Sequence, residues 1–145
     1  MNTEDNLSLH EYQALAEFRY QLRRFLHFSE EAAHRTGLEP RQHQLLLALK
    51  GLPEGRKANI TDIAERLQIK HHSAVELIDR LIARGFIERS PDASGHRRVL
   101  ITLTPQGEEI LHTLSHIHRA ELRTLSPDLI QALHSLNNDS NKTTS

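Results

Sequence analysis

The chain has 145 residues with a formal net charge of −1, and it contains no cysteine and no tryptophan. This length suits a single domain that buries about 70% of its unfolded surface, and the missing cysteines exclude a disulfide framework, a thiol nucleophile and an iron–sulfur cluster. A mean hydropathy of −0.54 without a long apolar run excludes a membrane span, and the acidic first residues are unlike a signal peptide, so we expect a cytoplasmic protein.

Two helices are predicted in the first third of the chain. Ser8 and Glu11 have the spacing of a capping box, and apolar residues then recur at three- and four-residue intervals until Gly37 supplies the usual stop. Pro40 is typical of a first helical position, so a second, leucine-rich helix is predicted over residues 41–50.

The middle third of the chain is predicted to contain a helix-turn-helix. After a short extended piece at residues 58–60, Thr61 is expected to cap a compact helix over residues 62–67. Two residues separate it from an amphipathic fourth helix over residues 70–84, which basic residues flank. Two helices joined by so short a turn are the signature of this motif.

A β-hairpin is predicted to follow. Residues 86–89 and 99–103 alternate or are β-branched, as in strands, and the turn-rich segment between them ends in Arg97 and Arg98. Residues 56–98 carry nine basic against six acidic side chains, whereas the segments before and after each have a net charge of −2. The hairpin tip therefore belongs to a basic island between acidic flanks.

The last third is predicted to hold two helices, because Thr104-Pro105 and Ser126-Pro127 each combine a cap with a following proline. The polar tail, residues 137–145, is expected to be disordered. We divide the single chain into N-terminal helices (8–55), a winged helix-turn-helix (56–104), C-terminal helices (105–136) and this tail.

The predicted fold class is mainly α with a small β-hairpin, and its element order points to double-stranded DNA. A major groove about 12 Å wide admits one α-helix, and an arginine on a hairpin tip can enter the minor groove beside it. The residues predicted to bind DNA are Thr61, Lys70, His71, His72, Ser73, Glu76, Arg80, His96, Arg97 and Arg98.

Two of these assignments have a simpler alternative. Glu76 and Arg80 lie one helical turn apart, so an intrahelical ion pair and base recognition both remain open. Arg56 and Lys57 are interpreted as loop charge.

No sequence pattern of a hydrolase or a phosphate-binding loop is present, so neither an enzyme nor a cofactor is predicted.

The sequence resembles the MarR family of bacterial transcriptional regulators over almost its whole length. The residues that carry the resemblance are Gln42, 63–67 (IAERL), 75–81 (VELIDRL), 84–89 (RGFIER) and 103–107 (LTPQG). The resemblance implies a homodimer, formed by the first, fifth and sixth helices, that places two winged helices on a palindromic operator. It also implies a regulator, more often a repressor, that a small-molecule effector releases from DNA.

The wing departs from the family pattern. Family members often have Asp-Arg-Arg where this chain has Gly95-His96-Arg97, so the aspartate that braces the minor-groove arginine is absent here. Asp92 is the acidic residue that can take its place, and Arg98 adds a second guanidinium.

The resemblance also suggests where an effector binds. A hydrophobic ligand is expected where the first and second helices meet the winged region, near Leu22, His43 and Leu46.

His112 and His116 have the i, i+4 spacing of a metal-binding pair, and zinc-responsive family members combine such a pair with a histidine on the second helix, here His43. No metal is our main prediction. A zinc-responsive regulator and a winged-helix protein-interaction module remain the alternatives.

Overall fold

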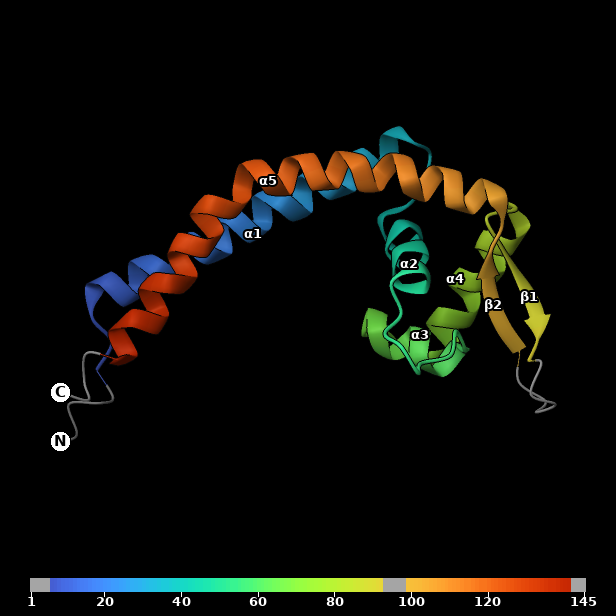
Figure 1. Ribbon diagram of the computed structural model, residues 1–145, viewed down its shortest axis with the longest axis horizontal. Helices are drawn as coiled ribbons and strands as arrows, with labels where there is room; N and C mark the ends of the chain where they lie inside the picture. Colours follow the sequence, from blue (N-terminus) through green and yellow to red (C-terminus); the bar gives the residue numbers. More distant parts are fainter. Residues whose placement is uncertain (1–5, 93–98, 142–145) are drawn as a thin grey trace. The chain divides into compact units, whose positions relative to one another are not determined.

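The computed structural model of the protein describes residues 6–92 and 99–141, the last three by their backbone alone. The elements in order are α1 (Leu9–Arg35), α2 (Pro40–Lys50), α3 (Ile60–Leu67), α4 (His71–Ala83), β1 (Ile87–Pro91), β2 (Val99–Leu103) and α5 (Pro105–Asn141) (Figure 1). The chain forms a two-helix unit, Met1–Glu31 with Ile117–Ser145, and a winged-helix unit, Ala32–His116. The predicted fold class is confirmed, whereas the predicted division by function at residues 55 and 104 stays a prediction.

In the two-helix unit, α1 and α5 lie side by side (Figure 1). The Nε2 atom of His118 on α5 lies 2.7 Å from the Ser29 hydroxyl on α1, and the edges of the Phe25 and Phe28 rings meet the imidazole at centroid distances of 5.9 and 6.0 Å. The predicted capping box at the start of α1 is present, because the Glu11 N–H donates to the Ser8 hydroxyl at 3.2 Å and Glu11 accepts from the Ser8 N–H.

Two predictions for the end of the chain are wrong. A new helix was expected to begin at Ser126-Pro127, but α5 continues through Pro127. Proline removes one helical hydrogen bond, and here the turns on both sides are held by packing, since Leu125 and Ala132 are buried. The tail expected to be disordered from residue 137 is helical as far as Asn141. No segment within the part that the structure describes is both long and apolar enough to cross a membrane.

The core of the winged-helix unit gathers residues from nearly all its elements. Leu45 and Leu46 of α2 pack with Ile63 of α3, Ile78 of α4 and Ile101 of β2, and all five are fully buried or nearly so. The two strands pair antiparallel, with Ile87 opposite Leu103 and Pro91 opposite Val99. The inward side chains of the two strands, Ile87 and Ile101, therefore anchor the hairpin in this core.

A single guanidinium connects four parts of this unit. Arg84, which follows α4, donates from one nitrogen to the Gly37 carbonyl oxygen at 2.7 Å and to Oε1 of Gln42 at 3.1 Å. Its Cζ atom also lies 5.0 Å from the centroid of the Phe86 ring, a cation–π distance. The loop before α2, α2 itself, the end of α4 and the start of β1 are thus fixed to one another.

A second junction connects the end of α4 to the start of α5. Gly85 adopts a φ of +80°, which glycine tolerates without strain, and its carbonyl oxygen accepts from the Thr104 hydroxyl at 2.6 Å. The same hydroxyl accepts from the Gly107 N–H at 3.1 Å, while the Thr104 N–H donates to the Phe86 carbonyl oxygen. Thr104 therefore caps α5 as predicted.

The close approach at Gly107 gives a stability prediction. A Cβ atom at this position would overlap the carbonyl oxygen of Phe86 and would lie 3.2 Å from Cδ2 of Leu103. We expect Gly107→Ala to lower the free energy of unfolding by about 2–4 kcal/mol, because backbone rather than a flexible side chain must move. Urea denaturation followed by circular dichroism measures this change.

The matched control is Gly51→Ala at the end of α2, where φ is −100° and the nearest atom lies 3.3 Å away. We expect a change of about 1 kcal/mol or less there. Equal losses for the two variants would contradict the account of this junction.

Candidate nucleic-acid interface

The turn between α3 and α4 sets the angle of the helix-turn-helix. Gln68 ends α3 in the left-handed region with a φ of +55°, and its N–H donates to the Glu65 carbonyl oxygen. Its side-chain amide donates to the same carbonyl at 2.8 Å, which helps to hold this unusual conformation for a residue other than glycine. The Ile69 N–H then bonds to the Ala64 carbonyl oxygen, so the turn is closed by three hydrogen bonds.

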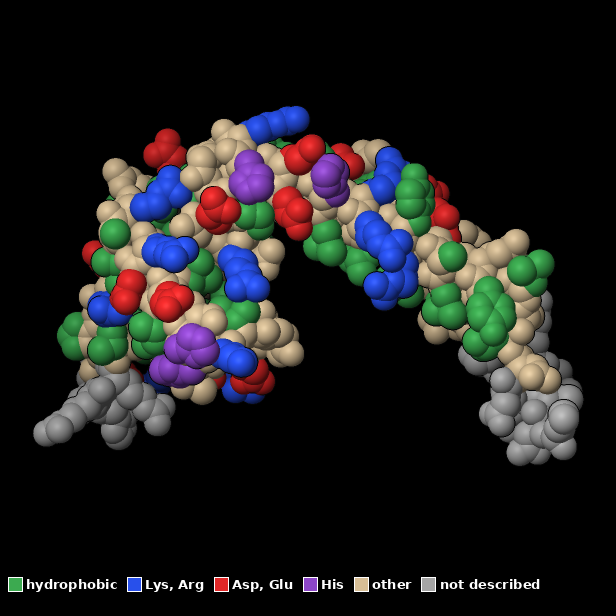
Figure 2. Space-filling view, turned by 180° about the vertical axis from the view of Figure 1, so that it is seen from behind, with side chains coloured by type: hydrophobic (Ala, Val, Ile, Leu, Met, Phe, Trp, Pro, Cys, Tyr) green, Lys and Arg blue, Asp and Glu red, His purple; other side chains and the backbone are tan. Residues whose placement is uncertain are grey.

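The surface of α4 separates an apolar face from a polar one. Ala74, Ile78 and Leu81 are buried against the core. The predicted DNA-binding residues of this helix lie on the other side: Lys70, His71, His72, Glu76 and Arg80 are exposed, and Ser73 is half-buried. Figure 2 shows histidine surface next to Lys or Arg surface on the winged-helix unit. The structure thus brings these side chains together on one exposed face, and their role stays a prediction.

The cations of this unit fall into two groups. Several are bound to carboxylates, as in the pairs Lys50–Glu108 at 3.0 Å and Arg89–Asp79 at 2.5 Å. Among the residues that the structure describes, the side chains of Lys70 and Arg80 have no ion pair, and the Glu76–Arg80 pair left open by the sequence is not formed. The charges of Lys70 before the first turn of α4 and of Arg80 in its last turn are therefore available to an external anion.

The start of α3 differs from the prediction. The helix begins at Ile60, and its cap is Asn59 rather than Thr61: the Asn59 side chain accepts from the Asp62 N–H at 2.8 Å. The signal was in the sequence, because asparagine is as good a cap as threonine and an acidic residue follows three positions later. The extended piece expected at residues 58–60 forms no strand, although the Ile101 N–H of β2 donates to the Ala58 carbonyl oxygen.

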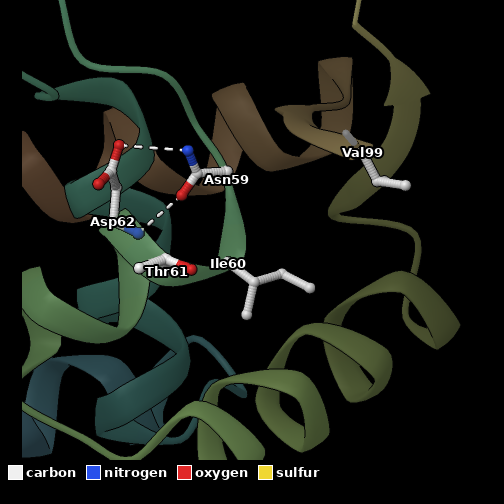
Figure 3. A pocket seen from close by; sticks show the side chains of 5 residues that line it. All are labelled: Asn59, Ile60, Thr61, Asp62 and Val99. Atoms are coloured by element: carbon white, nitrogen blue, oxygen red, sulfur yellow. Dashed lines mark hydrogen bonds between the residues drawn. The ribbon is translucent and has the colours of Figure 1, made fainter. Parts of the chain in front are cut away.

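A hollow of about 500 Å³ lies beside this helix start, lined by Asn59, Ile60, Thr61, Asp62 and Val99 (Figure 3). In Figure 3 the Asn59 side chain donates to the Asp62 carboxylate and accepts from the Asp62 backbone N–H, and Ile60 points away from that pair. Thr61 is exposed at the rim and is free of the capping role that the sequence suggested. The hollow lies between the start of α3 and Val99 at the start of β2.

The loop end of the hairpin, just after β1, makes a contact that the sequence did not reveal. Nζ of Lys57 donates to Oδ2 of Asp92 at 3.0 Å, although Lys57 was interpreted as loop charge. The two residues are 35 positions apart, so no local pattern marks them. The predicted wing contacts His96, Arg97 and Arg98 lie outside the described residues.

The predicted effector residues have contrasting surroundings. Leu22 lies in the two-helix unit and is exposed, while His43 and Leu46 lie in the winged-helix unit and are buried. His112 and His116 do meet on α5, with 3.2 Å between their Nε2 atoms. Within residues 6–92 and 99–141, no group of three His, Cys, Asp or Glu side chains is arranged to hold a metal ion. The effector-binding and metal-binding roles of these residues stay predictions.

Sequence comparison identifies relatives of this arrangement. A family model described as the MarR family matches residues 36–98. An uncharacterized HTH-type transcriptional regulator from Bacillus subtilis strain 168, YfiV, is 32% identical over 79 residues. This match covers 52% of the chain and 49% of the relative, so it spans about half the length of that curated protein.

Two solved structures share the fold over most of the chain. A MarR family transcription regulator has a TM-score of 0.71 and 24% identity, covering 91% of this chain and 88% of its own. A complex of MepR from Staphylococcus aureus with DNA has a TM-score of 0.68 and 20% identity, covering 87% and 90%. These two likenesses show the fold, and the predicted winged helix is confirmed.

Proposed function

We propose that this chain is a transcriptional regulator of the MarR family, whose model matches residues 36–98, and that it acts as a homodimeric repressor on a palindromic operator. In this proposal the start of α4 enters the major groove, and the hairpin tip lies in the adjacent minor groove. Corresponding points of the two half-sites are about 34 Å apart, one turn of the double helix.

The observation that carries the proposal is the exposed group of Lys70 and two histidines at the start of α4. Lys70 is exposed and has no carboxylate partner in the described part of the chain, and His71 and His72 follow it directly. The N-terminus of a helix adds positive potential at the same place. A phosphate oxygen binds such a group without first breaking an ion pair.

The start of α3 supplies a second phosphate contact. The Thr61 hydroxyl lies at the rim of the hollow between α3 and β2, and the first N–H groups of a helix have no acceptor within it. Asp62 repels phosphate, but its carboxylate accepts from the Asn59 amide at 3.3 Å and lies 3.9 Å from the Arg56 guanidinium. We propose that Thr61 binds the DNA backbone and that Glu76 and Arg80 face the base edges.

Salt dependence tests the phosphate contacts. Each phosphate that a protein neutralises contributes about −0.9 to the slope of log affinity against log salt concentration. We expect Lys70→Ala to weaken binding to the chain's own upstream DNA and to make the slope of a dimer shallower by about 1.8, because each protomer loses one contact. Fluorescence anisotropy at several salt concentrations measures both effects.

Lys50→Ala is the matched control, since Lys50 belongs to the same unit but is paired with Glu108. It is expected to leave the slope unchanged. A wild-type protein that shifts no genomic fragment at low salt would refute the proposed function.

The exposed apolar residues of the two-helix unit support the homodimer. Figure 2 shows hydrophobic surface along these helices. The large apolar side chains exposed there are Leu7, Leu9, Tyr12, Leu15, Tyr20, Leu22, Leu26, Ile117, Leu122, Ile130 and Leu133. A patch of this kind on a surface helix pair is typical of an interface between copies of a chain.

Substitution at this face tests the dimer. Ile130 is 50% exposed in the two-helix unit, and Leu47 is 49% exposed in the winged-helix unit. We expect Ile130→Glu to weaken dimerisation by at least about tenfold, because a buried charge without a partner opposes association. Sedimentation equilibrium measures the dissociation constant. Leu47→Glu is the control and should leave it unchanged; a loss of dimer with Leu47→Glu alone would contradict this assignment.

We also propose that a small hydrophobic effector lowers operator affinity, since ångström-scale changes in the spacing of two α4 helices disturb the fit to two half-sites. A zinc-responsive regulator is the second candidate, favoured by the 3.2 Å approach of His112 and His116. Calorimetric titration with aromatic acids, phenols and Zn²⁺, repeated in the presence of operator, distinguishes the two. A winged-helix module that binds only protein would give no salt-dependent DNA complex.

A further inference from the structure

A buried carboxylate lies just after the end of β1, and its only role expected from the sequence is to brace the wing arginine. The side chain of Asp92 is 5% exposed, and its Oδ2 atom accepts from Nζ of Lys57 at 3.0 Å. Lys57 belongs to the connector between α2 and α3 and is 47% exposed. The pair therefore ties the connector to the hairpin, with the carboxylate inside and the ammonium at the surface.

Ala58, the next residue of the connector, is hydrogen-bonded to β2. The Ala58 carbonyl oxygen accepts from the Ile101 N–H of β2 at 2.8 Å. Asn59 then caps α3 through the Asp62 N–H. Three consecutive residues thus hold β1, β2 and the start of α3 in one arrangement.

The environment of this pair differs from that of a comparable one. Lys50 and Glu108 have the same 3.0 Å separation, but both side chains are about half exposed, at 58% and 46%. Exposed pairs contribute little because water replaces either partner, whereas water replaces a lost partner less readily at a carboxylate as buried as that of Asp92. The Lys57–Asp92 pair is therefore the one whose loss is expected to shift the hairpin.

We propose that Lys57 is a positioning residue that acts through Asp92 and sets the direction of the hairpin relative to α3 and α4. This inference rests on the proposed function, because it concerns how one protomer fits its hairpin and its α4 helix to the same duplex. Without the pair, α4 and Thr61 still meet the DNA, but the hairpin no longer has a fixed direction toward the adjacent groove.

The sign of one substitution separates positioning from simple charge. Asp92→Asn removes a negative charge from a surface that approaches a polyanion, so electrostatics alone predicts equal or tighter DNA binding. Positioning predicts weaker binding, because a neutral amide does not hold the Lys57 ammonium as a carboxylate does. The two accounts thus give opposite results for the same variant.

The experiment is a double-mutant cycle on operator affinity with the full-length dimer. We expect Lys57→Met and Asp92→Asn each to weaken binding by about tenfold, and the double variant to be no weaker than either single variant. Lys57→Arg should restore binding, since it keeps a cation that donates to Asp92. Lys50→Met, which breaks the exposed pair, should bind as the wild type does.

A second measurement does not depend on how well Asp92→Asn folds. The affinity of the Lys57→Met variant is measured for two operators, one with A·T pairs and one with G·C pairs under the hairpin. The side chain substituted in this variant is half exposed. Positioning predicts that the preference between the two operators shrinks, whereas a direct phosphate contact of Lys57 predicts equal weakening on both.

Three results would overturn the inference: tighter or unchanged binding by Asp92→Asn, additive losses in the double variant, or an unchanged operator preference in Lys57→Met. In each of these the wild type still binds DNA, so the proposed function survives. Failure of the wild type to bind any fragment is the separate result that refutes the function itself.

Discussion

The hydrogen bonds and ring contact of the Arg84 guanidinium hold the winged-helix unit together. The same side chain meets the Gly37 carbonyl oxygen, the Gln42 amide and the Phe86 ring, so it joins the loop before α2, the helix α2 and the start of the hairpin. Since Arg84 follows α4 directly, this junction also fixes the helix that presents Lys70. The presentation of the face proposed to bind DNA therefore depends on a contact at the opposite end of the helix.

The arrangement of charge follows from this framework. Cations that serve the fold are already engaged: Arg84 with carbonyl oxygens and Lys57 with the buried Asp92. Lys70 and Arg80 have no such partner among the described residues. A chain with a net charge of −1 thus offers positive charge where a duplex would lie, because its acidic residues compensate other cations.

Local patterns predicted most of the elements, because their signals are contained within a few residues. The Ser8–Glu11 capping box, Gly37 after α1 and Pro40 at the start of α2 all have the expected structural roles. The features that the sequence did not reveal depend on contacts between residues far apart in the chain. Continuation of α5 through Pro127 depends on buried neighbours, and the Lys57–Asp92 pair joins residues far apart in the chain. The cap of α3 is different, since Asn59 and Thr61 both satisfied the local rule and only the backbone distinguishes them.

The central claim is that two copies of one winged-helix surface bind neighbouring grooves of the same duplex. Hydroxyl-radical footprinting of the complex tests it most directly, because the cleavage pattern records which backbone positions each protomer covers. The account predicts two symmetric sets of protected positions on one face of the DNA, about 34 Å apart, each with a minor-groove segment at its outer edge. One set of protected positions, or two sets on opposite faces, would contradict it.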